Sequence, residues 1–215
     1  MLQLSVQAAH AYVRRVLDEL VDLEDIGMLV SSDAIDLRNL TEGMLPEAAV
    51  KVHNRAPSIL LEGVSAVAGK DYRATMENGV ITIEMLKDTI RLASIIVEGS
   101  PVVSDPIPED SAEGRKQLNS YTRGVYDDPR VVVAKQWAAD HRPIFKFYST
   151  EAASLPGIQL EYVPYPALEE SSVPVSPRLE YAVLNELAAM VLDSVSEHDK
   201  AALYRTKANE YMEGK

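Results

Sequence analysis

Residues 176–212 read SPRLEYAVLNELAAMVLDSVSEHDKAALYRTKANEYM, and the spacing of their apolar side chains predicts two amphipathic helices. Ser176 is expected to cap the first helix, with Pro177 at its first position. The run from Ser196 to Asp199 resembles a capping box and should begin the second helix. Because only a short break near residues 193–196 separates the two, we expect an antiparallel helical hairpin.

The other end of the chain also has a helical pattern. Apolar residues recur at steps of three and four between Ser5, which is expected to cap the helix, and Leu20. Residues 31–55 suggest two further short helices, the second beginning near Pro46, and Pro57 should stop them. The two ends together predict a small helical bundle made of residues 1–57 and 176–215.

The middle of the chain changes to the period of β-strands. Residues 72–84 contain Asn78-Gly79, a pair that suits the two-residue turn of a β-hairpin. Further strands are expected near residues 90–97, 131–135, 144–148 and 158–163, and residues 165–177 read as a linker. We therefore predict an α+β fold in which residues 58–175 form an antiparallel β subdomain inserted into the helical bundle.

A long irregular segment, residues 100–130, interrupts the predicted strands. It is rich in Pro, Gly, Ser and charged residues, and loops of this length in compact proteins are usually functional or disordered. Tyr and Arg, which dominate protein interfaces, gather within it at Tyr121, Arg123, Tyr126 and Arg130. An intermolecular contact and a loop folded back onto its own sheet explain these residues equally well.

The C-terminal hairpin supplies three more candidate interface residues. Leu184 widens the apolar face of its helix beyond what one neighbour in the same chain is expected to cover. Tyr204 and Tyr211 share one face of the last helix. We therefore expect part of this hairpin to contact another protein.

Composition excludes several classes of function. The 215 residues carry a formal charge of −12, which disfavours binding to a phosphate backbone, and the absence of cysteine excludes thiol chemistry and thiolate metal sites. No secretory signal is evident, and no apolar run approaches the roughly 20 residues of a membrane span. We expect a soluble protein made in the cytoplasm, without sequence-specific nucleic-acid binding and without membrane association.

No catalytic, cofactor or metal motif stands out. The four histidines lack metal-ligand spacing, and phosphate-binding glycine loops are missing. Two alternatives stay open. Glu84 and Glu161 would be the carboxylates of a hidden hydrolase, and Trp137, Tyr162 and Tyr165 would form the stacking platform of a carbohydrate- or protein-binding β module on a helical base.

The chain from about Ile81 onward resembles the head–tail connector (neck) proteins of tailed bacteriophages, of the crAss-like podovirus type. The resemblance is carried by the helical ends and by the runs NSYTRGVYDDPRVVVAKQW (119–137), FKFYS (145–149), LEYVPYP (160–166) and LNELAAMVLDSVSEHDKAALYRTKANEYM (184–212). It implies a structural virion protein and not an enzyme. Such proteins are made in the bacterial cytoplasm and assemble in the virion neck as a ring, often twelvefold.

In this family the ring lies beneath the portal protein and joins it to other neck or tail proteins, with DNA passing through the lumen. The resemblance implies that helices contact neighbouring subunits while loops reach adjacent rings. The β insertion departs from purely helical adaptors, which leaves the details of docking open.

Overall fold

The computed structural model describes residues 1–20, 34–125, 128–134, 141–148, 154–168 and 171–213. The fold is α+β, as predicted, with helices at both ends of the chain and sheets in its middle. The chain divides into a helical unit, Met1–Leu61 with Pro166–Lys215, and a β-rich unit, Glu62–Tyr165. The first boundary between the units follows residue 61, four residues later than expected, and the second follows residue 165, ten residues earlier than expected.

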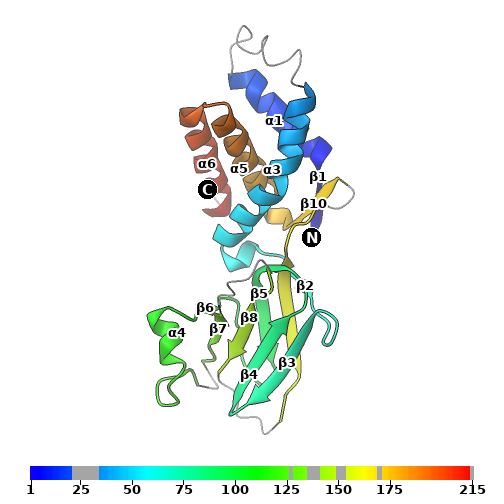
Figure 1. Ribbon diagram of the computed structural model, residues 1–215. Helices are drawn as coiled ribbons and strands as arrows, with labels where there is room; N and C mark the ends of the chain where they lie inside the picture. Colours follow the sequence, from blue (N-terminus) through cyan, green and yellow to red (C-terminus); the bar gives the residue numbers. More distant parts are fainter. Residues whose placement is uncertain (21–33, 126–127, 135–140, 149–153, 169–170, 214–215) are drawn as a thin grey trace. The chain divides into compact units, whose positions relative to one another are not determined.

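The helical unit packs its helices around one central helix. Its elements are β1 (Leu2–Ser5), α1 (Val6–Leu20), α3 (Ala34–Arg55), η1 (Ser58–Leu60), β10 (Ser172–Val175), η2 (Pro177–Leu179), α5 (Glu180–Ser194) and α6 (His198–Glu213). Every residue of α5 from Ala182 to Leu192 is buried, because α1, α3 and α6 all pack against it (Figure 1). Helices from both ends of the sequence therefore share one core.

The N-terminal helices begin and continue for identifiable reasons. The Ser5 hydroxyl accepts a hydrogen bond from the Ala8 amide at 3.1 Å, which confirms the predicted cap.

Residues 34–55 form the single helix α3, so the prediction of two pieces separated at Pro46 is wrong. An interior proline costs about 3 kcal/mol. Burial of the neighbouring apolar side chains offsets that cost: Leu45, Ala48, Ala49 and Val52.

The turn between α5 and α6 ends one helix in a Schellman motif. Ser196 has φ +66°, its amide donates to Asp193 O, and the Glu197 amide donates to Leu192 O at 2.9 Å. Ser196 is therefore the left-handed residue that ends α5. The predicted capping box beginning at Ser196 is wrong, although the antiparallel hairpin is confirmed.

A two-stranded ladder joins the N-terminus to the segment that precedes α5. β1 and β10 are antiparallel, with Leu2 opposite Val175 and Ser5 opposite Ser172. Leu4, Val173 and Val175 are buried in the core of the helical unit. Residues 172–175 therefore belong to this unit, and the expectation of a linker over residues 165–177 is wrong for them.

The β-rich unit contains two sheets that bury one core. The elements are β2 (Val64–Ser65), β3 (Tyr72–Glu77), β4 (Val80–Met85), β5 (Thr89–Val97), β6 (Ile107–Pro108), α4 (Ala112–Lys116), β7 (Val131–Ala134), β8 (Ile144–Phe147) and β9 (Ile158–Pro164). One sheet has the order β2-β9-β5 and the other β3-β4-β8-β7-β6. All pairs are antiparallel except β6 with β7, which is parallel. Side chains of both sheets meet in a single apolar cluster.

The hairpin of β3 and β4 confirms the sequence prediction. Asn78 has φ +50° and Gly79 φ +73°, as a two-residue primed turn requires, and Glu77 pairs with Val80 across it. The resulting register places Ile81, Ile83 and Met85 in the core.

Candidate interaction site

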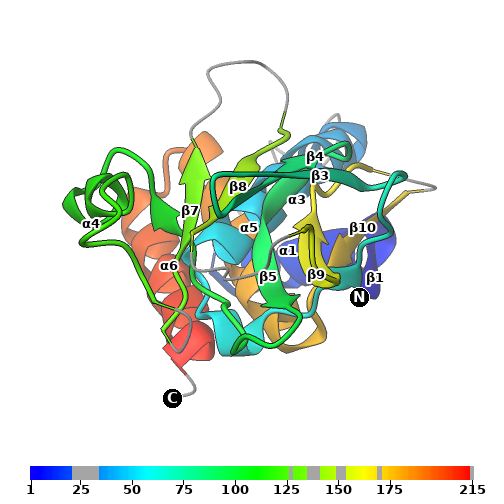
Figure 2. The same ribbon diagram turned by 90° about the horizontal axis from the view of Figure 1, so that it is seen from below.

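Several exposed apolar side chains lie in the segment that follows β6, and we call residues Ser111–Val125 the arm. In both views α4 lies beside β6 and β7, at the end of the five-stranded sheet opposite β3 (Figures 1 and 2). Glu109, just before the arm, accepts a hydrogen bond from Lys146 Nζ at 2.5 Å, and this bond raises the pKa of Lys146. The base of the arm is therefore fixed to β8.

Local hydrogen bonds fold the first half of the arm into α4. Ser111 Oγ donates to Pro108 O at 2.7 Å and accepts from the Gly114 amide at 3.0 Å, which caps the short helix. A Cβ on Gly114 would lie 2.3 Å from Pro108 O, so the close approach requires glycine.

Gln117 closes the second half of the arm. Its side chain accepts a hydrogen bond from the Gly124 amide at 2.8 Å and donates a long one to Glu113 O at 3.4 Å. The Thr122 hydroxyl donates to Lys116 O at 2.7 Å. Because Gln117 is only 3% exposed, it acts as an internal clamp, and the arm is ordered by its own contacts.

This ordered arm presents apolar side chains to solvent. Tyr121 is 96% exposed, Val125 64% and Leu118 62%. A loop without internal hydrogen bonds could turn these apolar side chains toward its own surface. The hydrogen bonds of Gln117 instead hold the backbone that carries them. Exposed apolar groups on a preordered loop are typical of a protein-docking surface.

The predicted interface residues of the long loop separate into two groups. Tyr121 faces solvent, as a contact residue should, and Arg130 pairs with Asp128 at 2.8 Å on the surface. Arg123 lies over the Tyr148 ring at 5.6 Å, and among the described residues its buried Nε has no hydrogen-bond partner. Arg123 therefore folds back onto its own unit. Tyr126 lies outside the described residues.

The predicted interface residues of the hairpin also divide. Leu184 and Tyr204 are buried in cores of the helical unit, so the expectation that they present an uncovered face is wrong. α1, α3 and α6 together cover α5, which a single neighbour would not have done. Tyr211 is 48% exposed and stacks on Tyr181, with ring centroids 5.6 Å apart.

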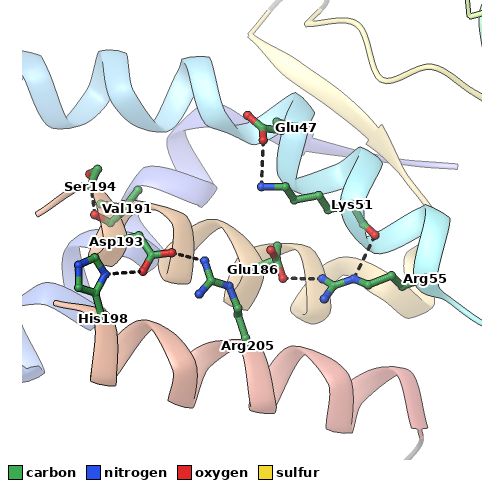
Figure 3. Close-up of polar contacts among 9 residues, drawn as sticks. All are labelled: Glu47, Lys51, Arg55, Glu186, Val191, Asp193, Ser194, His198 and Arg205. Atoms are coloured by element: carbon green, nitrogen blue, oxygen red, sulfur yellow. Dashed lines mark hydrogen bonds and ion pairs between the residues drawn. The ribbon is translucent and has the colours of Figure 1, made fainter. Parts of the chain in front are cut away.

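Charged side chains in the helical unit link helices to one another. Figure 3 shows Arg55 of α3 bonded to the buried carboxylate of Glu186 on α5 at 2.5 Å. It also shows Asp193, at the end of α5, bonded to His198 at 3.1 Å and to Arg205, both on α6. The hydrogen bonds from His198 and Arg205 lower the pKa of Asp193. These pairs stabilise helix packing.

Neither alternative site is assembled by its predicted residues. Glu84 on β4 and Glu161 on β9 are exposed on different sheets. Tyr162 is buried, Tyr165 stacks on His141 with centroids 4.0 Å apart, and Trp137 lies outside the described residues. In the part of the chain that the structure describes, no group of three or more His, Asp or Glu side chains could hold a metal ion.

Sequence reasoning missed most of the residues that shape the arm. Gln117, Leu118 and Val125 are ordinary residues in a Ser- and Gly-containing loop, and no local pattern marks a glutamine as a clamp. The run of Tyr and Arg points to the same segment but does not indicate its internal order.

Comparisons with known proteins add no family. No protein-family model matches the chain, and no curated protein matches it either. Among the described residues, no helix is both long and apolar enough to cross a membrane.

Proposed function

We propose that this protein is a ring-forming head–tail adaptor, a structural virion protein that links the portal to tail components of a phage around the DNA channel. The observation that carries the proposal is the arm, which is ordered by its own hydrogen bonds yet exposes Tyr121, Leu118 and Val125. A subunit whose role is to hold other proteins needs such a surface, and an exposed apolar surface is costly without a partner.

The division into two units supports a bridging role. The helical unit and the β-rich unit each bury a core of their own, so each is able to hold a different neighbour. Exposed aromatic side chains occur on both: Tyr121 on the arm, and Tyr181 with Tyr211 on the helical hairpin. Tyrosine is among the residues that contribute most to interface energies.

The charge of the chain also suits a channel wall. At a formal charge of −12, a ring of copies repels the phosphates of DNA and does not retain them during passage. The proposed location is the virion neck, and the proposed partners are further copies of this chain, the portal protein and neighbouring neck or tail proteins.

Native mass spectrometry and cryo-electron microscopy of the purified full chain test this function, with and without the portal protein made from the same genome. We expect a closed ring, of twelve copies in the simplest case, that binds the portal. The matched variant Tyr121→Ala should fold normally, because its side chain makes little contact with its own unit, and should bind its neighbours less tightly. A wild-type chain that stays monomeric and binds neither portal nor tail proteins would refute the proposal.

A further inference from the structure

A buried histidine in the helical unit has both ring nitrogens bonded to the main chain. His53 of α3 is fully buried; its Nδ1 lies 2.7 Å from the carbonyl oxygen of Ala49, and its Nε2 lies 3.0 Å from the amide nitrogen of Ser176. A carbonyl oxygen can only accept a hydrogen bond, and an amide can only donate one. The two partners therefore require a neutral ring with its proton on Nδ1 and a lone pair on Nε2.

The Ser176 amide is the point at which α3 holds the segment that leads into α5. Ser176 lies between β10 and η2 and is fully buried. Its carbonyl oxygen accepts a hydrogen bond from the Leu179 amide at 2.8 Å within η2. The strand just before it, β10, pairs with β1 and lies beside α3. The hydrogen bond from Ser176 to His53 therefore fastens both β10 and the start of α5 to α3.

The elements around His53 offer little compensation for a positive charge on the ring. Among the described Asp, Glu, Lys, Arg and His side chains of the helical unit, Glu186 of α5 is the other buried one, and its carboxylate is already bonded to Arg55 at 2.5 Å. Met1, whose Sδ accepts a hydrogen bond from the Ser176 hydroxyl at 4.0 Å, carries an amino group of the same sign as a protonated ring.

The strands β1 and β10 contain no ionisable side chain. The remaining described charged or titratable side chains of α1, α3, η2 and α5 are at least partly exposed: His10, Arg14, Arg15, Asp18, Glu19, Arg38, Glu42, Glu47, Lys51, Arg178, Glu180 and Asp193. Water screens these groups, so they stabilise a charged ring in the core only weakly.

We propose that His53 is a proton-sensitive latch, which holds β10 and the start of α5 on α3 while it is neutral and releases them when Nε2 is protonated. A proton on Nε2 would face the amide hydrogen of Ser176, so two buried donors would lose their hydrogen bond. The ring would then have to move toward water, and the helical unit would open where α3 meets β10. This inference goes beyond the proposed function and does not depend on it.

The direction of the pH effect follows from proton binding. A histidine in an unfolded chain has a pKa of about 6.5. Below that pH the opened state binds a proton that the closed latch does not, so the stability of the helical unit falls as the pH falls. A ring that stays neutral while the latch is closed raises the equilibrium constant for opening about thirtyfold between pH 8 and pH 5.

Amide hydrogen exchange of the full chain at these two pH values tests the latch, after correction for the intrinsic pH dependence of exchange. Peptides that cover residues 172–180 report on the latch, and peptides that cover β4 report on the β-rich unit as an internal control. We expect protection of residues 172–180 to fall about thirtyfold at pH 5. Protection of β4 should change by less than about threefold, since the β-rich unit has a core of its own.

The variant His53→Gln separates the latch from other causes of acid sensitivity. Glutamine retains an acceptor for the Ser176 amide but does not titrate. The thirtyfold loss of protection should therefore disappear in this variant. The matched control is His10→Gln, which changes a half-buried histidine of α1 in the same unit and should keep the full loss. Urea denaturation at pH 8 checks that both variants fold.

Nuclear magnetic resonance of the imidazole nitrogens in the wild type gives a second test that needs no variant. We expect the neutral Nδ1–H tautomer of His53 at pH 8, and a protonated ring only together with loss of protection at the Ser176 amide. A ring that becomes protonated while this amide stays protected overturns the inference. So does acid sensitivity that persists in His53→Gln, which would assign the effect to another group such as Glu186, and so does protection that is equal at both pH values.

Discussion

Replacing Gln117 with alanine should loosen the arm without destabilising the molecule. The substitution removes the 2.8 Å hydrogen bond from the Gly124 amide and the longer, weaker one to Glu113 O. Two such bonds contribute about 1–3 kcal/mol. Because Gly124 is half-buried and water replaces part of the loss, we expect the lower half of that range, about 1–2 kcal/mol, for the free energy of opening the arm.

Amide hydrogen exchange measures this free energy directly. An opening free energy lowered by about 1–2 kcal/mol speeds exchange of the Gly124 amide roughly five- to thirtyfold. The thermal midpoint should change by less than about 2 °C, since the arm contributes no side chain to the core of the β-rich unit. Gln159→Ala, on an exposed position of β9, is the matched control and should alter neither quantity. Unchanged protection at Gly124 would refute the clamp, and so would a large fall in the thermal midpoint.

Three further predictions concern the helical unit and are measured by urea denaturation. His53→Leu should lower the free energy of unfolding by about 1–3 kcal/mol, because it removes the ring nitrogen that accepts a hydrogen bond from the buried Ser176 amide at 3.0 Å. His53→Gln retains an acceptor and should recover part of this loss. Equal stability of the two variants would contradict the role of His53 as an acceptor. Ser196→Gly should raise stability by about 0.5–1 kcal/mol, since glycine adopts the φ of +66° without strain, and a decrease would show that the serine side chain matters more than the backbone. Asp193→Asn should lower the free energy of unfolding by about 0.5–1 kcal/mol at pH 7. Because the pKa of Asp193 is lowered in the folded state, this difference from wild type should shrink as the pH falls below about 4. A difference that is constant with pH would exclude the ion pair with Arg205 as its source.

The sequence predicted those elements whose cause is local. Asn78-Gly79 determines its turn by the backbone conformations that the two residues accept, and Ser5 caps α1 with an atom three residues from its partner. The terminal helices follow from apolar spacing along each segment. In these cases the residues that specify the structure are near one another in the chain, so a single sequence contains enough information.

The elements that sequence reasoning missed depend on distant partners. β1 and β10 pair across about 170 residues, and the Ser-Val-Pro-Val run of β10 has the proline of a typical loop. Pro46 lies within a helix because the core on one side of α3 outweighs a local preference. Leu184 and Tyr204 were predicted to contact another protein because the apolar spacing of one helix does not tell how many helices pack around α5.

The candidate site was predicted only in part for the same reason. Tyr121 was identified from residue type, whereas the order of the arm comes from a buried glutamine that bonds seven residues away. Arg123 carried the same residue-type signal, yet its guanidinium lies on Tyr148 of its own unit. Composition finds a segment rich in contact residues, and only the packed structure tells which of them face outward.

The antiparallel pairing of Leu2–Ser5 with Ser172–Val175 has a consequence for biosynthesis. The ribosome delivers α1 and α3 long before β10 and α5, so the first helices must wait without their central partner while the intervening sheets are translated. The β-rich unit has all of its strands within one continuous stretch and is free to mature first. Nascent chains are therefore most vulnerable to proteases and chaperone capture at α1 and α3, until β10 and α5 have emerged.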